Sequence, residues 1–407
     1  MTVLFFSDSY RPYVSGVVTS MDVYAEELRK LGHRVVIVAP DYPDVAEDPD
    51  VFRLPSMPLP AYPKLRLIAP LTRRLIKQLL DLRPSVVHAH SPFAAGLLGL
   101  YIARAAECPA VFTCHSIYEE YTRYLPALSQ PLKAVVRKYL VHYCGYCQLI
   151  LAPSPHMRDF LIDTGVSGNL EVLPTGVDSG VAHPPARRGG RSGKAFVIAL
   201  VGRLAKEKNM DLALLTMFHL AQGNGKERDR WRLLIVGDGP ESERLHNLAV
   251  ELGIKSLVTF LGEVPREQVF HNLRLADCLI FTSTIETQGL VMLEAMSMGL
   301  PVVAADSPAA TALLNNGCEG FIAPPEPEEM ARAISRLAAD RPMAARMGAA
   351  AATRSREYQP SLLARRLADH YAALLAGGSP QANGTPQART PEAGIPQPDA
   401  PSALLSR

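Results

Sequence analysis

Two carboxylates, Glu286 and Glu294, form an E-x7-E pattern around the start of an expected helix. An apolar strand is expected over 278–281, a helix from Gly289, and a second strand over 301–304. The first peptide N–H groups of a helix have no partner within it, and they attract anions. The pattern therefore predicts an anion site flanked by two acids. The alternative is a solvated pair of glutamates beside an ordinary helix.

The stretch Glu286-Thr-Gln-Gly-Leu-Val-Met-Leu-Glu294 resembles the signature of the retaining glycosyltransferase family 4, whose members have the GT-B fold. The resemblance implies an α/β chain of two doubly wound, Rossmann-like domains with parallel sheets, facing a central cleft. It also implies that the helix N-terminus, with Gly289, Leu290 and Val291, receives the diphosphate of a nucleotide sugar. Glu286 would then reach hydroxyls of the sugar, and Glu294 would bind the ribose.

Two cations follow an expected strand over 196–201. Arg203 and Lys208 stand in the segment G-R-L-A-K-E-K-N, which resembles the diphosphate-binding segment of the same family. Two fixed cations at a diphosphate can stabilise the charge of the leaving group, as a divalent metal ion does in other enzymes. A solvated charged loop is the alternative.

Glycines at the ends of expected strands are further candidates for donor binding. Ser15-Gly16 opens a helix that should end at Gly32, and Gly16 would let backbone N–H groups approach a diphosphate; a plain tight turn is the alternative. Gly237 and Gly239 end another strand and would permit close approach to the ligand. Val264 ends the segment Phe-Leu-Gly-Glu-Val, which lies where relatives enclose the base with backbone groups.

Three segments of the first half, HAHSPF, GLLGLYIA and TCHSIYEEY, are similar to the acceptor domain of bacterial diacylglycerol glucosyltransferases. Cys114 and Ser116 depart from the usual T-Y-H-T of that group, whereas His115 remains. His115 would follow a strand and could hydrogen-bond a sugar hydroxyl; a core histidine bonded to backbone is the alternative. His88 and His90 are predicted to be structural, because an H-x-H on a strand places both side chains on one face without a third ligand.

Short runs rich in Val, Ile and Leu alternate with longer amphipathic stretches, which indicates parallel sheets covered on both faces. The runs in the first half cover 3–6, 34–39, 85–89, 110–114, 149–152 and 171–173, and those in the second half cover 196–201, 233–236, 258–261, 278–281 and 302–304. Ligands of such sheets bind beyond the carboxyl ends of the strands, where the candidate residues lie.

The length of 407 residues suits two domains rather than one core. We expect an acceptor domain over 1–178, a linker over 179–193, a nucleotide-sugar domain over 194–354, and a helix over 355–376 that crosses back to the first domain. The segment 377–407 is rich in Pro and polar residues and is predicted to be disordered.

The segment Leu65 to Leu80 predicts a basic amphipathic helix, with Ile68 on its apolar face and Arg66 on the opposite face. Such a helix can dock on an anionic membrane, or it can pack on its own sheet. The segment 132–143 is a second, weaker candidate.

Composition excludes several classes. A net charge of +2 gives no bulk attraction to nucleic acid, and no apolar run or N-terminal pattern predicts a membrane span or a signal peptide. The six scattered cysteines indicate reduced thiols in a cytosolic protein, and Cys144-Gly-Tyr-Cys147 lacks partners at the spacing of a zinc site. Asp48-Pro49-Asp50 has no strand before it and is interpreted as a chance match to a metal-binding D-x-D.

Together these features predict a retaining glycosyltransferase that needs no metal or other cofactor. The resemblance implies transfer of a hexose, with glucose from UDP-glucose as the expected donor, to a membrane lipid such as diacylglycerol. Phosphatidylinositol, a sugar or a polysaccharide precursor remain alternative acceptors. A non-hydrolysing sugar-nucleotide epimerase and a catalytically silent sugar-nucleotide-binding protein remain alternative functions. The enzyme is expected in the cytoplasm, peripherally on the inner face of the membrane.

Overall fold

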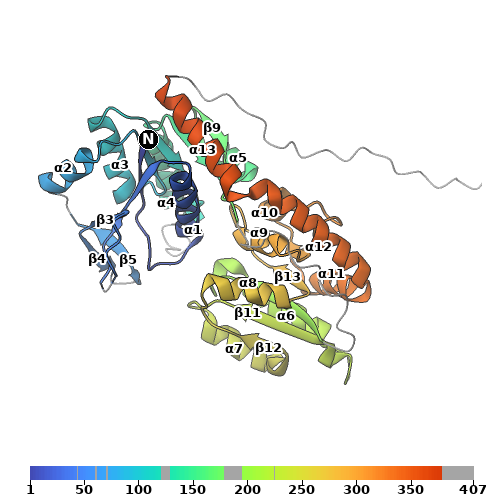
Figure 1. Cartoon of the computed structure of the whole chain (residues 1–407). Helices are drawn as coiled ribbons and strands as arrows, with labels where there is room; N and C mark the ends of the chain where they lie inside the picture. The colour runs from blue at the N-terminus through green and yellow to red at the C-terminus, as the bar shows by residue number, and fades with distance from the viewer. Residues whose placement is uncertain are drawn as a thin grey trace, which may run out of the picture.

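The computed structural model describes residues 1–43, 45–59, 62–69, 72–120, 129–177, 195–223 and 225–377. The expected linker over 179–193 lies outside the described residues, as does the expected tail from residue 378 on. The described chain forms two α/β domains (Figure 1). The two parallel sheets expected from the sequence are confirmed.

The sheet of the first domain has the strand order β3-β2-β1-β6-β7-β8-β9, and all its neighbours run parallel. Its apolar strands are almost fully buried, as a sheet covered on both faces requires. Within β1, Val3 and Phe5 face one core while Leu4 and Phe6 face the other. The strands are β1 (Thr2–Phe6), β2 (Arg34–Pro40), β3 (Val51–Leu54), β6 (Val86–Ala89), β7 (Ala110–Thr113), β8 (Leu149–Ala152) and β9 (Leu170–Val172).

Helices cover both faces of this sheet. One face carries α1 (Gly16–Lys30) and the C-terminal helix α13 (Pro360–Leu375), whose buried side chains share one core. The other helices of the domain are α2 (Arg73–Asp81), α3 (Ala94–Ala105), α4 (Ser129–Cys144) and α5 (Pro155–Thr164). Helix α1 ends before Gly32, whose φ of +85° is the left-handed turn that glycine favours.

The second domain repeats the plan with the strand order β12-β11-β10-β13-β14-β15. Its strands are β10 (Phe196–Val201), β11 (Trp231–Val236), β12 (Val258–Phe260), β13 (Cys278–Phe281), β14 (Val302–Ala305) and β15 (Gly320–Ala323). Its helices are α6 (Met210–Leu220), α7 (Ser242–Glu251), α8 (Arg266–Leu275), α9 (Leu290–Ser297), α10 (Pro308–Leu313), α11 (Pro327–Ala339) and α12 (Arg341–Ser355). Short 3-10 helices cover Lys206–Lys208, Arg228–Arg230, Lys255–Leu257 and Arg356–Tyr358.

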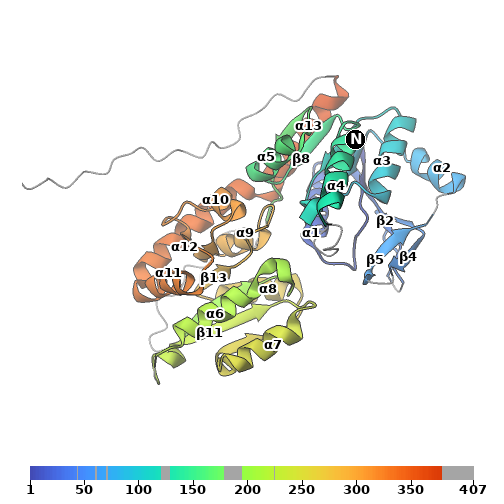
Figure 2. The ribbon, with the colours of Figure 1, turned by 180° about the vertical axis from the view of Figure 1, so that it is seen from behind.

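Several contacts join the two domains. Helix α13 leaves the second domain and packs against α1 of the first (Figures 1 and 2). The buried side chain of Gln288 accepts a hydrogen bond from the backbone N–H of Thr175 at 2.9 Å and donates one to its carbonyl oxygen at 2.8 Å. A backbone hydrogen bond of 3.0 Å joins Val177 to Tyr358. The loop between β13 and α9, which carries Glu286, is thereby held against the first domain.

The predicted basic helix over 65–80 is wrong in its first part. Residues up to Ile68 belong to β5 (Tyr62–Ile68), which pairs antiparallel with β4 (Ser56–Leu59). The guanidinium of Arg66 lies 5.7 Å from the ring of Tyr42 and donates to Ser56, so it does not line a helix face. A proline at position 70 has no N–H for a helix that runs through it, and α2 begins only after its N-cap Thr72.

Both sheets reverse their strand order at one point, between β1 and β6 in the first and between β10 and β13 in the second. Ligands of open parallel sheets bind at such reversal points, beyond the carboxyl ends of the strands. The candidate site residues follow these central strands or a neighbouring strand, except Val264, which follows the edge strand β12. The topology therefore gathers them at facing edges of the two domains.

Candidate functional site

Lys208 and Glu286 meet in an ion pair between Nζ and Oε1, although they are far apart in the sequence. Lys208 ends the 3-10 turn after β10, and Glu286 lies in the loop after β13. Side chains of that second loop tie the two together, because Thr282 donates to the carbonyl oxygen of Lys208 at 2.7 Å and Ser283 donates to that of Glu207 at 3.1 Å. The structure thus brings together a predicted phosphate-binding cation and a predicted sugar-binding carboxylate.

The N-terminus of α9 lies beside this pair. Gly289 is its N-cap, with a φ of +75° that side chains rarely adopt, and no side chain among the described residues caps the helix. The N–H groups of Leu290 and Val291 at this end keep the character of an anion site. This is the position that the sequence predicts for the diphosphate.

The N-terminus of α1 approaches the same helix from the first domain. A Cβ added to Gly16 would lie 3.7 Å from Cδ1 of Leu290, an ordinary contact, and Gly16 does not have a positive φ. Neither crowding nor backbone conformation therefore requires glycine here. The prediction that Gly16 lets a ligand approach the backbone stays open.

Arg203 reaches toward the first domain. Its exposed guanidinium donates from Nη1 to the hydroxyl of Tyr13 at 3.4 Å, across the two domains. Tyr13 lies in the loop between β1 and α1, and the sequence analysis does not single it out. In the sequence, the only indication of a role for Tyr13 is its position shortly before Gly16, which opens α1.

Glu294 lies one turn further along α9 and is mostly buried, with its side chain 15% exposed. Burial raises the pKa of its carboxyl, whereas the nearby guanidinium of Arg266 lowers it. Nη2 of Arg266 lies 3.4 Å from Oε1 of Glu294, and Arg266 opens α8 directly after the loop that holds Val264. Arg266 is a neighbour that the sequence analysis missed.

We predict that replacing Arg266 by methionine shifts the pH dependence of nucleotide binding. Without the guanidinium, the pKa of Glu294 rises further. A carboxylate that accepts ribose hydroxyls must be ionised, so affinity is full above this pKa and falls as the pH drops through it. The fall should therefore begin at a higher pH in the variant, measured as the Kd of UDP between about pH 5 and pH 8.

Arg274→Met is the matched control, because Arg274 lies on the same helix but donates to Sδ of Met298 at 3.4 Å. Its pH profile should follow that of the wild type. Coinciding profiles for Arg266→Met and the wild type would contradict a role of Arg266 at Glu294.

His115 comes from the first domain to the loop of Glu286. Its carbonyl oxygen accepts a hydrogen bond of 2.9 Å from Thr287, the residue next to Glu286. His115 is 9% exposed, and burial lowers the pKa of its imidazole to about 4, so the ring is neutral. Its ring partner is another histidine, because Nε2 of His115 lies 3.0 Å from Nδ1 of His90.

The two histidines predicted to be structural differ from each other. His88 bonds the hydroxyls of Tyr371 at 2.6 Å and Thr113 at 2.7 Å, within the core. His90 instead contacts His115, a candidate site residue. Strand β6 lies beside β7, so residues just beyond their ends become neighbours, and this adjacency was the signal that the sequence analysis passed over.

Gly237 is required by the chain itself. It has a φ of +133°, and an added Cβ would lie 2.0 Å from the carbonyl oxygen of Gly202. Gly239 is crowded in the same way, at 2.4 Å from the carbonyl oxygen of Leu204. The close approach predicted at these glycines is therefore made by the chain's own backbone, and ligand contact there stays a prediction.

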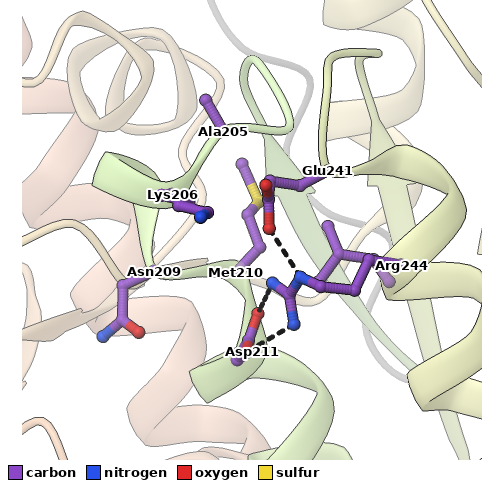
Figure 3. A pocket seen from close by; sticks show the side chains of 8 residues that line it. Ala205, Lys206, Asn209, Met210, Asp211, Glu241 and Arg244 are labelled. Atoms are coloured by element: carbon purple, nitrogen blue, oxygen red, sulfur yellow. Dashed lines mark hydrogen bonds and ion pairs between the residues drawn. The ribbon is translucent and has the colours of Figure 1, made fainter. Parts of the chain in front are cut away.

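A separate hollow of about 350 Å³ lies behind the 3-10 turn (Figure 3). Arg244 on its wall donates to both carboxylate oxygens of Asp211, at 2.9 and 2.6 Å, and to Glu241 at 2.5 Å. Lys206 lines this hollow, whereas Lys208 of the same turn pairs with Glu286. The two lysines therefore point to different sites, Lys206 to this hollow and Lys208 to Glu286.

The remaining candidates do not form a metal or redox site. Asp50 pairs with Arg29 at 3.2 Å, and its N–H donates to Asp48 at 2.9 Å. Burial raises the pKa of the thiols of Cys144 and Cys147, which makes both poor nucleophiles. Among the described residues, no three side chains of His, Cys, Asp or Glu gather as a metal ion would require. Independence from metal stays a prediction.

Two family models match the chain, one in each half. Residues 14–180 match Glycosyltransferase Family 4, and residues 186–354 match Glycosyl transferases group 1. The chain is 31% identical to the alpha-monoglucosyldiacylglycerol synthase of Streptococcus pneumoniae, over 79% of this chain and 75% of that protein. It is 27% identical to a GDP-mannose-dependent alpha-mannosyltransferase of Corynebacterium glutamicum, over 79% of this chain and 76% of that protein.

Solved structures share the architecture. The crystal structure of Anabaena HepE in complex with UDP and glucose aligns with a TM-score of 0.70 at 21% identity, over 92% of this chain and 100% of that one. At this identity the likeness concerns the fold alone. The GT-B fold expected from the sequence is confirmed.

Proposed function

Since this chain belongs to the glycosyltransferase family 4, we propose that it is a retaining, metal-independent enzyme that transfers glucose from UDP-glucose to diacylglycerol in a membrane. The observation that carries the proposal is the contact of Lys208 with Glu286 beside the uncapped N-terminus of α9. One cation, one carboxylate and free N–H groups at a single point fit a sugar linked to a diphosphate.

The donor would lie between the two domains. Arg203, Lys208 and the N–H groups at the start of α9 would hold the diphosphate, Glu294 would accept hydroxyls of the ribose, and Glu286 with His115 would orient the sugar. As the bond from the anomeric carbon to the diphosphate oxygen breaks, the cations stabilise the charge that grows on that oxygen. The acceptor hydroxyl attacks the same face, and its proton passes to the leaving phosphate. The configuration is therefore retained without a protein nucleophile.

The choice of glucose and diacylglycerol is supported by the name of the Streptococcus pneumoniae relative. The mannosyltransferase among the relatives supports a second candidate, a GDP-mannose-dependent enzyme. In both candidates the same residues would bind the diphosphate of the donor, and the candidates differ in the nucleotide base and the sugar. The donor assay below separates them.

A membrane acceptor is supported by one face of the first domain. Helices α4, α3 and α2 lie in a row across it (Figure 2). Leu97 and Tyr101, one turn apart on α3, are 50% and 55% exposed, and Phe93 at the N-cap of this helix is 47% exposed. Exposed cations, Arg73, Arg74 and Lys77, line the neighbouring α2. Apolar side chains flanked by cations fit an anionic bilayer surface.

In the described part of the chain, no helix combines the length and the apolar character that crossing a bilayer requires. Docking is therefore proposed as peripheral, with anionic lipid attracting α2 and the apolar side chains of α3 entering the headgroup region.

The test is a transfer assay with purified protein and radiolabelled UDP-glucose, UDP-galactose or GDP-mannose, on vesicles of phosphatidylglycerol with or without diacylglycerol. We expect a glycolipid with an α-linked glucose, formed from UDP-glucose only when diacylglycerol is present and formed equally in excess EDTA. Transfer from GDP-mannose would support the second candidate. A β-linked product, or isomerised nucleotide sugar without any transfer, would contradict the proposal. Phosphatidylinositol vesicles and soluble sugars serve as competing acceptors.

A further inference from the structure

We infer that His90 is a positioning residue for His115: it fixes the ring of His115 in one orientation and in one tautomer, with the proton on Nδ1 and a bare Nε2. The inference concerns this chain's own residues. Its consequence for donor binding rests on the proposed function.

The geometry around His90 leaves its ring little freedom. The ring stacks on His88 with 4.2 Å between centroids and 27° between planes, and Phe5 packs against it at 4.6 Å. The His115 ring lies 5.3 Å away and nearly parallel, at 18°. Because its neighbours hold the His90 ring, the 3.0 Å contact from Nδ1 to Nε2 of His115 fixes the second ring as well.

Exactly one proton fits between the two rings, and both rings are neutral. Burial lowers the pKa of His90 well below its usual value, and it lowers the pKa of His115 to about 4. A neutral imidazole has one N–H donor and one bare nitrogen that accepts. Hence either His90 donates to His115, or His115 donates to His90.

The other ring nitrogen of His90, Nε2, distinguishes between these two states. Its Nε2 is fully buried and has no hydrogen-bond partner among the described residues. If His115 were the donor, this Nε2 would carry a buried N–H with nothing to receive it, and orphaned buried N–H groups are rare in proteins. If His90 donates from Nδ1, only a bare nitrogen is left without a partner. We therefore assign the state in which Nδ1 of His90 donates to Nε2 of His115.

This assignment gives His115 a defined chemical role. With Nε2 occupied, Nδ1 is the nitrogen that remains, and it carries the proton. In the described part of the chain Nδ1 has no hydrogen-bond partner, and it is not among the fully buried polar atoms that lack one, so it keeps some exposure. His115 can therefore donate a hydrogen bond to an oxygen of the donor sugar, while it has no lone pair to offer.

The test uses the intact chain labelled with 15N-histidine. Long-range 1H–15N spectra at neutral pH distinguish a protonated from a bare ring nitrogen, and His115→Gln identifies the His115 signals. We expect a protonated Nδ1 and a bare Nε2 in the free protein. A protonated Nε2 on His115, or an equal mixture of both tautomers, would overturn the inference.

Two variants extend the test to function. His90→Phe keeps an aromatic ring in the stack but removes the donor, whereas His90→Asn places an amide N–H near the position of Nδ1. We expect His90→Phe to show mixed His115 tautomers and a fall of about tenfold in kcat/KM for the donor, with His90→Asn recovering most of that loss. A single Nδ1–H tautomer persisting in His90→Phe would contradict the role of His90.

The spectra test whether His90 positions His115, and kcat/KM tests whether His115 has its proposed role at the donor sugar. If the tautomer shifts in His90→Phe while kcat/KM stays at the wild-type value, the positioning by His90 stands and the role of His115 in the proposed function is refuted.

Discussion

Replacing Lys208 by alanine should lower the rate of transfer by about 100- to 1,000-fold while the fold stays intact. The ammonium is the cation that the structure holds against Glu286, at the uncapped start of α9. Its proposed work is to stabilise charge that grows on the leaving diphosphate, so its loss affects the transition state more than the ground state. The measurement is kcat and KM for the donor, together with a thermal melt of both proteins.

The fold should tolerate this change because hydrogen bonds to the backbone also hold this turn against the loop after β13. The backbone carbonyl of Lys208, which accepts from Thr282 at 2.7 Å, is unchanged in the variant. The Lys208 side chain is 27% exposed, so truncation removes some packing of its aliphatic stem, and the thermal melt measures that loss. A melting temperature close to that of the wild type would assign the lost activity to chemistry rather than to unfolding.

Lys206→Ala is the matched control, since it removes an equal charge from the same 3-10 turn. Lys206 lines the hollow behind the turn together with the paired Arg244 (Figure 3). Among the described residues, the ion-pair partner of Glu286 is Lys208 rather than Lys206. We expect activity within a few fold of the wild type. Equal losses in both variants would mean that the turn contributes only a diffuse positive field, and the specific diphosphate contact would be refuted.

Much of this fold could be predicted because the signals are local. Buried strands of a parallel sheet are continuous apolar runs, and the runs at 278–281 and 196–201 became β13 and β10 with the expected bounds. The ends of α1 could also be predicted, since the helix begins after its N-cap Ser15 and ends before the turn at Gly32, as expected.

The missed features are those made by contacts between distant segments. The residues around Arg266 in the sequence give no sign that it contacts Glu294, and those around Tyr13 give no sign that it contacts Arg203. Both pairs join segments that only the folded sheets bring together. His90 was judged by its own strand alone, although its partner comes from the neighbouring strand. A local pattern also failed at residues 65–68, where pairing with β4 prevailed over helical spacing.

Substituting Glu286 by glutamine should separate sugar binding from nucleotide binding. In the free protein the carboxylate of Glu286 offsets the charge of Lys208, and we expect a diphosphate to compete with this carboxylate for the ammonium. Glutamine keeps the size but removes the charge, which leaves Lys208 free for the diphosphate. We expect UDP, which has no sugar, to bind the variant at least as tightly as the wild type. Transfer should nevertheless fall about 100-fold, because the sugar loses the group that orients it.

Glu294→Gln provides the opposite pattern within the same motif. Its carboxylate is proposed to accept hydrogen bonds from the ribose, which UDP retains, and bonds to a charged group are worth about 1.5–3 kcal/mol. UDP should therefore bind this variant about tenfold more weakly or worse. Calorimetric titration of both variants with UDP decides the matter. If Glu286→Gln weakened UDP binding as much as Glu294→Gln does, Glu286 would contribute to holding the nucleotide. The proposed competition between Glu286 and the diphosphate for Lys208 would then be refuted.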